Sequence, residues 1–539
     1  MFVFNQEGSW TLLKNVVYPL LLITVICGSS VPNAIAVEPT LFSNCRLGVG
    51  GAYDNAIGYD LNQLNIGRYV DWRTNANPHN SGGVGLPANV QYLQMVRVKQ
   101  KKVGGWDSPY VSPPAYNFSP SAAQMATIAT ASPGSIWLIG NEIERVDWST
   151  GQQDEITPEL YATAFHEIQA LIKTADPTAQ VAIGGVILGT PLRLIYLDQV
   201  WTSYKAQFGY SMGQEIDIWN VHGFILPEVK GAWGMDIPAG LETPADYLPQ
   251  EGLFYSKGLL GDPSVPNNNV DYYTARDKQA DIALFANYLK AFRVWMAAKG
   301  ERNKPLLNTE YGLLNDFYGY YDEQDAVNFM HETFDYMFSA TDASVGYPLD
   351  ENRLVQGWFW YSLNSEWFPL GQLYNSTNKQ LTVVGQGWEN YVTDPGHPMA
   401  SVPQVNLLVA NLKATPNPAP TQPAQQATVT LSVDIANSGN VKTDTNNTIA
   451  VEFWNGPPNT SGSTKIGQTQ LVEDIGGCGD FITVSVTWSG LSTGQYKWFV
   501  KATPLNGETA TTDNTASSSL IVRGQSPEAN NSWLPVLIK

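Results

Sequence analysis

The sequence is poor in the residues that most metal and redox sites require. It has 3 Cys and 5 His among 539 residues, and it contains neither a Cys-x-x-Cys nor a His-Glu-x-x-His pattern. Without those spacings there is no zinc or thiol-redox signature. A Gly-rich phosphate-binding loop is also missing after the expected strands. We therefore expect neither a metal nor a cofactor.

Positive charge is scarce as well. Lys and Arg number 30 against 49 Asp and Glu, so the formal net charge is −19. A surface of this sign argues against nucleic acid or an anionic membrane as a partner. With 43% hydrophobic and 15% charged residues, the chain is globular rather than disordered. A length of 539 residues exceeds what one hydrophobic core supports, so two or more domains are expected.

The chain begins with an apolar run that is short for a membrane span. Lys14 precedes the run 16–27, and Ala34-Ile35-Ala36 follows it with the small residues typical of a cleavage site. We expect residues 1–36 to be a signal peptide, with the mature protein secreted and starting near Val37. An uncleaved anchor is the alternative.

Two cysteines remain after such a cleavage, Cys45 and Cys478. In an oxidising compartment they could pair. One is expected before the first strand of the first domain and the other within the second domain, so the geometry favours unpaired thiols.

The first part of the chain alternates apolar strands with amphipathic helices. Helices are expected after Thr157-Pro158, over 275–299 and over 323–339. The expected strands are 47–51, 67–72, 92–98, 136–142, 181–186, 216–222, 305–310 and 355–361. Alternation of this kind implies parallel βα units, and eight of them imply a (β/α)8 TIM barrel over residues 44–396. A doubly wound open sheet is the alternative.

From residue 404 the pattern changes to short alternating segments separated by turn residues, which is typical of an antiparallel β-sandwich. The motifs Asn437-Ser438-Gly439-Asn440, 484–488 and Thr512-Asp513-Asn514-Thr515 resemble the bacterial CARDB module. That resemblance implies an Ig-like sandwich over 404–523, followed by a tail over 524–539. An association with the cell surface through this module is left open.

Two glutamates follow apolar strands of the first part, Glu142 after 136–141 and Glu310 after 305–309. The carboxyl ends of parallel strands are where such folds place their chemistry. Two facing carboxylates suit the cleavage of a glycosidic bond, one as a neutral proton donor and the other ionised. When the carboxyl groups lie about 5–5.5 Å apart, the ionised one attacks the anomeric carbon and configuration is retained.

These two stretches resemble the clan A retaining glycoside hydrolases. Asn141-Glu142 matches the end of their fourth strand, and Thr309-Glu310-Tyr311-Gly312 matches the end of their seventh. The resemblance implies that Glu142 is the acid/base and Glu310 the nucleophile. It also implies that Asn141 binds the 2-hydroxyl of the sugar and that Tyr311 belongs with the substrate-binding residues.

The resemblance extends to two residues on other strands. His222, after the sixth strand, takes the place of a residue near the nucleophile, and Trp360 on the eighth is implied to floor the reacting subsite. Trp358 shares the parity of Trp360 and is an alternative. His222 could equally be a buried core histidine, and core packing is the alternative for Trp360. Trp72, at the end of the second strand, either lines the outer cleft or packs in the core.

A second carboxylate and a serine motif also bear on the chemistry. Glu144 competes with Glu142 for the role of proton donor. Gly209-Tyr210-Ser211-Met212-Gly213 matches a serine-nucleophile pattern, but a helix precedes it and a strand follows, which reverses the order of a true elbow, so Ser211 is expected in a turn. The long excursion over 226–273 is expected to be functional. If the protein is not an enzyme, we expect a non-catalytic carbohydrate-binding or adhesion protein on the same scaffold.

Overall fold

The structure is a computed structural model. It describes residues 42–52, 56–147, 151–226, 228, 234–241, 278–314, 319–421, 426–444, 448–508 and 510–524. The expected signal peptide, most of the excursion over 226–273 and nearly all of the tail lie outside the described residues. Among the helices that are described, none has the length and apolar character needed to cross a membrane.

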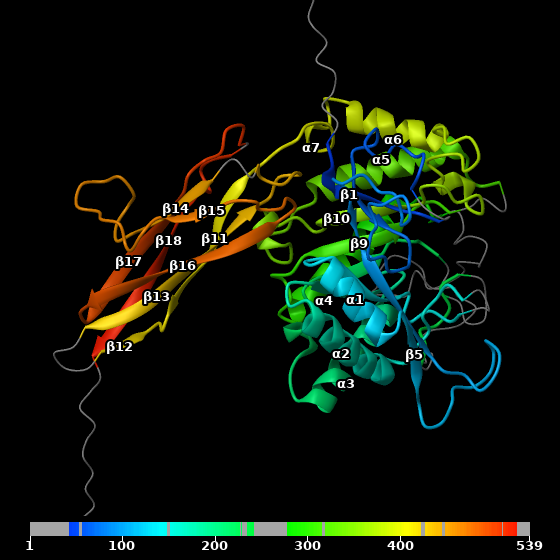
Figure 1. Cartoon of the computed structure of the whole chain (residues 1–539), viewed down its shortest axis with the longest axis horizontal. Coiled ribbons are helices and arrows are strands. Elements are labelled where there is room, and N and C mark those ends of the chain that lie inside the picture. Colours follow the sequence, from blue (N-terminus) through cyan, green and yellow to red (C-terminus); the bar gives the residue numbers. More distant parts are fainter. Residues whose placement is uncertain are drawn as a thin grey trace, which may run out of the picture. The chain divides into compact units, whose positions relative to one another are not determined.

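The first region alternates strands with helices, as expected (Figure 1). Its strands are β1 (Asn44–Gly50), β2 (Ile66–Val70), β3 (Gln91–Tyr92), β4 (Gln94–Gln100), β5 (Tyr116–Ser119), β6 (Ile136–Asn141), β7 (Gln180–Gly185), β8 (Trp219–His222), β9 (Leu306–Tyr311) and β10 (Gly357–Tyr361). Its helices are α1 (Ala122–Ala131), α2 (Pro158–Ala175), α3 (Pro191–Phe208), α4 (Ile282–Ala298), α5 (Glu323–Ser339), α6 (Val383–Thr393) and α7 (Pro398–Ser401).

The strands of this region pair in parallel, which confirms the predicted parallel α/β fold. One sheet has the order β3-β2-β1-β10-β9-β8 and another the order β5-β4-β6-β7, with only β4–β5 antiparallel among these pairs. Isolated parallel bridges, Ala182 with Ile218 and Val186 with Val221, connect β7 to β8. The N–H of Leu93, between β3 and β4, donates to the carbonyl of Tyr69 in β2.

Alternate residues of the strands pack into different clusters. One small cluster gathers side chains from β2, the β3–β4 segment, β6, β7, β8's entry, β9 and β10: Val70, Leu93, Met95, Ile136, Leu138, Ala182, Ile218, Leu307 and Phe359. Neighbours of opposite parity, such as Trp137, Trp219 and Trp358, belong to the larger cluster that the helices share. The strands therefore have one face toward the helices and another that converges on its own core.

Local signals explain where several helices begin. Asp322 caps α5 and exchanges hydrogen bonds with Asp325 in a capping box, so this helix has the bounds predicted from the sequence. Thr190 caps α3, and Gly209, at φ 82°, ends it. The helix expected over 275–299 begins at Ile282, after the cap Asp281, and residues 275–277 lie outside the described part.

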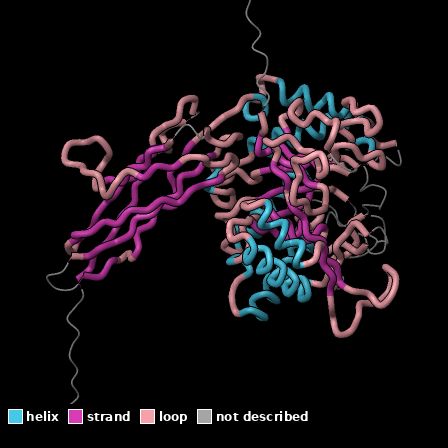
Figure 2. Tube along the Cα trace, in the orientation of Figure 1, coloured by secondary structure: helices cyan, strands magenta, loops and turns pink. Residues whose placement is uncertain are grey.

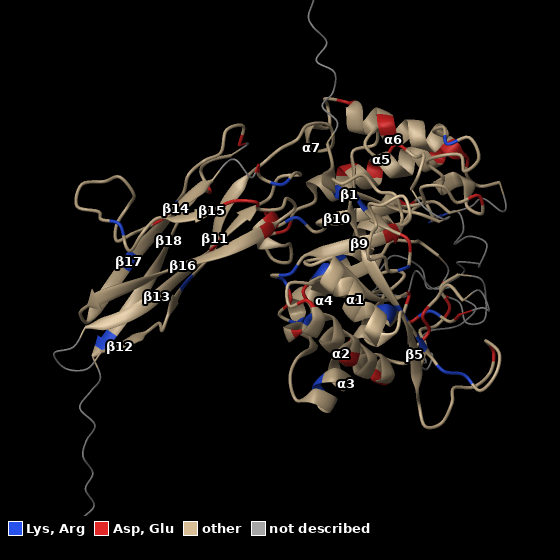
Figure 3. Cartoon of the chain, in the orientation of Figure 1, with Lys and Arg blue, Asp and Glu red and all other residues tan. Residues whose placement is uncertain are grey.

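The second region consists of strands and loops (Figure 2). Its strands are β11 (Leu407–Thr415), β12 (Ala419–Thr421), β13 (Ala427–Asn437), β14 (Ile449–Trp454), β15 (Gln470–Val472), β16 (Asp480–Leu491), β17 (Gly494–Ala502) and β18 (Thr515–Gly524). They form one sheet in the order β11-β13-β16 and another in the order β12-β18-β17-β14-β15. Both sheets contribute to one hydrophobic cluster that includes Leu431, Val433, Phe453 and Trp498. Acidic and basic residues are interspersed along the chain in both regions (Figure 3).

The two cysteines form a disulfide, so the expectation of unpaired thiols is wrong. The Cα atoms of Cys45 and Cys478 lie 6.2 Å apart. Cys45 is part of β1 rather than preceding it, and its N–H donates to the carbonyl of Asn440. The adjacent Arg46 donates from both terminal nitrogens to the Asp350 carboxylate. The two cysteines are 433 positions apart, and reasoning from the sequence did not predict that they would meet.

Candidate active site

Three titratable side chains meet at the carboxyl ends of neighbouring strands. Glu142 directly follows β6, His222 ends β8 and Glu310 lies near the end of β9. The Nδ1 of His222 is 3.5 Å from Oε1 of Glu142 and 3.8 Å from Oε2 of Glu310. One oxygen of each glutamate and a ring nitrogen of the histidine all lie within 4.8 Å of one another. The structure thus brings together both glutamates predicted from the sequence, although they are 168 positions apart.

The backbone at this site departs from ordinary strand geometry. Glu142 has φ 49° and Trp72 has φ 58°, both in the left-handed region, which non-glycine residues adopt uncommonly. Gly140, with φ 96°, bends the end of β6 where a Cβ would meet Ile143. Left-handed residues of this kind concentrate at functional sites, because the surrounding structure must compensate for their cost.

Each carboxylate has its own hydrogen-bond donor. Nη1 of Arg145 lies 2.8 Å from Oε2 of Glu142. The indole N–H of Trp72 donates to Oε2 of Glu310 at 3.0 Å. The His222 ring is 1% exposed, and among the described residues its Nδ1 has no hydrogen-bond partner of ordinary geometry. This buried nitrogen therefore lies close to both acids without being committed to either.

The two carboxyl groups differ in their affinity for a proton. Burial opposes ionisation of Glu142, but Arg145 and His222 together outweigh it and hold its pKa well below the usual range. Burial and the charge of Glu142 raise the pKa of Glu310 to about 7, against the opposing effects of His222, Trp72 and Arg145. Burial lowers the pKa of His222, but Glu310 and Glu142 reverse this and raise it above its ordinary value. Below about pH 7 the pair thus carries one proton and one negative charge.

An aromatic surface adjoins Glu310. The rings of Trp72 and Tyr361 lie 5.5 Å apart, those of Phe224 and Tyr361 lie 6.1 Å apart, and Phe368 lies 5.6 Å from Tyr361. Tyr361 shares the parity of Phe359, which belongs to the convergent core. Aromatic faces next to a pair of acids suit contact with the apolar faces of sugar rings.

Trp360, expected as the floor of the subsite, faces the other way. It is fully buried, its indole N–H donates to the carbonyl of Gly371, and its ring packs edge-on against Tyr311. Trp358, the alternative, packs against Phe338 of α5. Successive strand residues point to opposite faces, and the next residue, Tyr361, is the one whose ring lies beside Trp72.

Two other expected residues are near the glutamates in sequence without facing them. Tyr311 is fully buried, and its hydroxyl accepts a hydrogen bond from Thr333 of α5. The Asn141 amide donates to the carbonyl of Gln152 at 3.2 Å, and its buried Oδ1 has no hydrogen-bond partner among the described residues. Neither side chain has a contact with the carboxyl groups of Glu142 and Glu310 among those described.

The two alternative candidates for a catalytic role, Glu144 and Ser211, make contacts that stabilise the fold. Glu144 is fully buried and pairs with Arg193 at 3.2 Å, which leaves it unsuited as the proton donor. Ser211 caps a short 3-10 turn, Met212–Gln214, as expected of a turn residue. Arg145 was missed by sequence reasoning, although its position three residues after Glu142 on a turn was a usable signal. Trp72 was considered as a lining or a core residue, and its hydrogen bond to Glu310 follows from tertiary structure.

The Glu142–His222–Glu310 set could also hold a divalent cation, since one histidine and two carboxylates are common metal ligands. Two observations weigh against this. The guanidinium of Arg145 already neutralises Glu142, and separations up to 4.8 Å exceed the roughly 3–3.5 Å between ligands that share an ion with bonds of about 2.1 Å.

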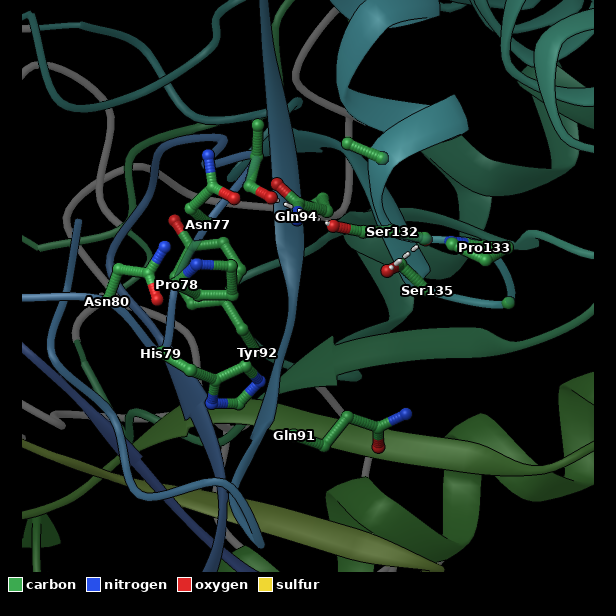
Figure 4. A pocket seen from close by; sticks show the side chains of 13 residues that line it. Asn77, Pro78, His79, Asn80, Gln91, Tyr92, Gln94, Ser132, Pro133 and Ser135 are labelled. Atoms are coloured by element: carbon green, nitrogen blue, oxygen red, sulfur yellow. Dashed lines mark hydrogen bonds between the residues drawn. The ribbon is translucent and has the colours of Figure 1, made fainter. Parts of the chain in front are cut away.

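A cavity of about 460 Å³ lies elsewhere in the first region (Figure 4). Its lining includes Gln91 at the start of β3 and Ser135 just before β6, so it opens at the amino ends of these strands. Its walls carry the polar residues Asn77, His79, Asn80, Gln94 and Ser132. It is therefore separate from the glutamate pair, which follows the carboxyl ends.

No protein-family model matches the sequence, and no curated protein matches it either. Among solved structures, a GH128 (subgroup II) endo-β-1,3-glucanase from Sorangium cellulosum is 15% identical over 64% of this chain and 98% of its own, with a TM-score of 0.36. A family 44 xyloglucanase from Paenibacillus polymyxa is 11% identical over 82% of this chain and 98% of its own, with a TM-score of 0.34. A CARDB domain from Pyrococcus furiosus is 16% identical over 23% of this chain and 96% of its own, with a TM-score of 0.16. The chain is thus similar to glycoside hydrolases, with low sequence identity and a low TM-score. The interpretation of its function therefore rests on the geometry of the site.

Proposed function

We propose that this protein is a secreted retaining glycoside hydrolase that cleaves O-glycosidic bonds of a polysaccharide or oligosaccharide. The observation that supports it best is the approach of Glu142 and Glu310 to within 4.8 Å at the carboxyl ends of parallel strands. Retaining enzymes place their carboxyl groups about 5–5.5 Å apart, whereas inverting enzymes need about 6.5–9.5 Å to admit a water. The observed separation favours the retaining geometry.

The proposed roles follow the strand positions in the family resemblance, with Glu142 as acid/base and Glu310 as nucleophile. Glu142 gives its proton to the glycosidic oxygen while Glu310 bonds to the anomeric carbon and the leaving group departs. Glu142 then takes a proton from water, whose oxygen displaces Glu310 and restores both carboxyl groups.

The ligand-free charge distribution is the reverse of the one these roles require at the moment of reaction, because Glu310 holds the proton more tightly than Glu142. The number of protons is nevertheless correct, since the pair shares one proton and one negative charge. His222 lies between the two acids and offers the path by which the proton changes sides. His222 thereby sets which of the two glutamates carries the proton.

We also propose that the first region is a closed eight-stranded barrel and the second an Ig-like, CARDB-like module. The pairing of β1 with β10, the bridges between β7 and β8 and the convergent core support closure. The Cys45–Cys478 disulfide supports an oxidising compartment, and hence secretion.

Alanine variants of both glutamates, with azide as an external nucleophile and aryl glycosides as substrates, test the mechanism. Without the acid/base, the glycosyl-enzyme still forms and azide attacks it to give a glycosyl azide of retained configuration. Without the nucleophile, azide attacks the substrate directly and gives the inverted product. We expect retention for Glu142→Ala and inversion for Glu310→Ala. The opposite pairing would reverse the roles.

The same assay separates the rival interpretations. Undiminished hydrolysis by either variant, on a substrate that the wild type cleaves, would refute the proposed mechanism. Saccharide binding without turnover by the wild type, measured over a panel of glucan, xylan, mannan and galactan, would indicate a binding protein. Activity that is lost with a chelator and restored by a divalent cation would instead assign the three side chains to a metal centre.

A further inference from the structure

Arg145 lies between the candidate acid and a backbone carbonyl of a distant segment. Its Nη1 is 2.8 Å from Oε2 of Glu142, while its Nε and Nη2 donate to the carbonyl oxygen of Gly234 at 3.2 and 2.8 Å. The side chain is 18% exposed, so these bonds form largely away from water. One planar guanidinium thus connects the turn after β6 to the segment after β8.

The Gly234 carbonyl is held in place without any help from Arg145. Arg193 of α3, fully buried, donates through Nη2 to the carbonyls of Met235 and Asp236 at 2.6 and 3.0 Å. Its Nε lies 3.2 Å from Oε1 of Glu144. The N–H of Ala239 donates to the carbonyl of Glu144 at 2.7 Å. The segment around Gly234 is therefore fixed to the same turn that carries Glu142.

The arrangement leaves Glu142 with two distinct oxygens. Oε2 accepts the hydrogen bond from Arg145, and Oε1 is directed toward Nδ1 of His222. Rotation of the carboxyl group would break the first contact, so the guanidinium determines which oxygen faces the second acid. A bridge to a carbonyl on one side and a carboxylate on the other restricts this rotation more than a free cation would.

Charge at Glu142 depends on the same side chain. The groups that face it are His222 from β8, Glu310 from β9 and Glu144 from its own turn. Two of these are acids, and the histidine is cationic only when protonated. Among the described residues that act on Glu142, Arg145 is accordingly the permanent cation.

We infer that Arg145 is a positioning residue, through which the segment around Gly234 sets the orientation and the charge of the Glu142 carboxylate. The inference rests on the proposed function for its catalytic meaning, because Glu142 must receive a proton before it can protonate a leaving group. Loss of the hydrogen bonds to the Gly234 carbonyl, or of the guanidinium itself, changes how readily Glu142 accepts that proton.

A direct titration tests this independently of any activity. In full-length protein labelled with 13C at the glutamate carboxyl carbons, the Glu142 resonance is assigned by its loss in Glu142→Gln. We expect Arg145→Gln to raise the pKa of Glu142 by about one pH unit or more, since an adjacent opposite charge typically shifts a carboxyl by 1–3 units. The matched control is Lys173→Gln. Lys173 lies in the last turn of α2 and pairs with Asp217 at 2.8 Å, so its loss removes a cation elsewhere and should leave the Glu142 titration unchanged.

Kinetics supply the second readout. Arg145→Lys keeps the charge and loses the bridge, so both limbs of the kcat/KM pH profile should stay in place while kcat falls by about tenfold to a hundredfold. Arg145→Gln should move both limbs to higher pH. Equal Glu142 titration in wild type and Arg145→Gln would overturn the inference. So would a kcat of Arg145→Lys equal to that of the wild type, a result that remains decisive if Arg145→Gln does not fold.

The outcome also distinguishes this inference from the proposed function. A wild type that hydrolyses no glycoside, but whose Glu142 titration shifts in Arg145→Gln, would support the control of charge by Arg145 and contradict the hydrolase. If the wild type hydrolyses glycosides but its Glu142 titration is the same in Arg145→Gln, the hydrolase is supported and the control of charge by Arg145 is contradicted.

Discussion

Arginine meets carboxylate at both ends of the parallel strands, with different consequences. Near the amino ends, Arg46 and Asp350 are both fully buried, and the aspartate also accepts hydrogen bonds from Gln356 and Arg353. At the carboxyl ends, Arg145 binds Glu142, and the His222 ring, which titrates, lies 3.8 Å from Glu310. In the first cluster three side chains donate to the aspartate, whereas in the second two acids share one proton and one negative charge.

The contrast shows how one kind of interaction serves stability in one place and chemistry in another. A buried ion pair with all its partners resists change, because removing one member leaves an uncompensated charge. A functional site must keep groups whose charge is not fully compensated. The left-handed backbone at Glu142 and Trp72 is likewise an energetic cost that the surrounding structure must offset. Substitutions in the two places should therefore separate loss of rate from loss of stability.

The largest effect is expected at Glu310. We predict that Glu310→Gln lowers kcat by about 10⁴-fold or more, in line with the loss of a nucleophile. The melting temperature should not fall, since the amide removes a buried ionisable group whose pKa is raised to about 7. Steady-state kinetics and thermal unfolding at about pH 7.5, just above that pKa, measure both quantities. A variant that loses stability in proportion to activity would place Glu310 with the structural group.

The next effect should appear in stability alone. Asp350→Asn leaves the buried Arg46 without its counter-charge, and breaking a buried pair in this way costs about 3–5 kcal/mol. We predict a lower urea midpoint with kcat unchanged on the remaining folded protein. Arg353→Gln, which removes a partly exposed partner of the same aspartate, is the control and should cost less. A lower kcat in Asp350→Asn would contradict the view that the amino ends of the strands serve stability and the carboxyl ends serve chemistry.

The disulfide should give a similar or smaller change. The double variant Cys45→Ser with Cys478→Ser is expected to lose about 2–4 kcal/mol of unfolding free energy, the usual range for a bridge. Activity at low temperature should persist, because the bridge joins β1 to the second region at the end of the strands opposite the glutamates. Differential scanning calorimetry and an activity assay on the same sample provide the measurements.

A smaller, graded effect is expected with pH. The pKa of Glu310 is raised from 4.5 to about 7, so the pair keeps its single proton below pH 7 and loses it above. We predict that kcat/KM falls about tenfold per pH unit above that value. Because the folded state holds this proton more tightly than the unfolded chain, the stability it contributes is present below pH 4.5 and is lost as pH rises through 7. Glu310→Gln should lack this part of the pH dependence, and a wild-type alkaline limb far from pH 7 would contradict the coupling.

The smallest effect is predicted for Trp72→Phe. The indole N–H favours the ionised form of Glu310, so its loss should raise the pKa of Glu310 and move the alkaline limb upward by less than one unit. The rate should fall by about tenfold, the lower end of what one hydrogen bond to a charged group contributes. Trp106→Phe, in the loop between β4 and β5, serves as a tryptophan control and should leave the profile in place.

Much of the fold follows from local signals. The capping box at Asp322 and the apolar period after it give α5 its bounds, and the apolar run before Asn141-Glu142 gives β6. The two glutamates were found because each terminates such a run. These features depend on a few neighbouring residues, and so a short window of sequence contains the necessary information.

The faces of the strands were harder to assign. β10 is apolar on both sides, with Trp358, Phe359 and Trp360 all buried, so its composition does not show which parity turns toward the helices. The family resemblance placed Trp360 at the site, whereas in the structure it is Tyr361 whose ring lies beside Trp72. The partner of Cys45 and the donor to Glu310 likewise depend on contacts across the fold rather than along it.

The sequence by itself determined the order of strands and helices, the two acids at strand ends and the boundary where the all-β region begins, because periodicity, caps and turn residues act over a few positions. Only the tertiary structure decided which oxygen faces which donor, which acid retains the proton and which tryptophan donates to Glu310. These properties arise from burial and from charges a few ångströms away in space, and neither quantity is a function of distance along the chain.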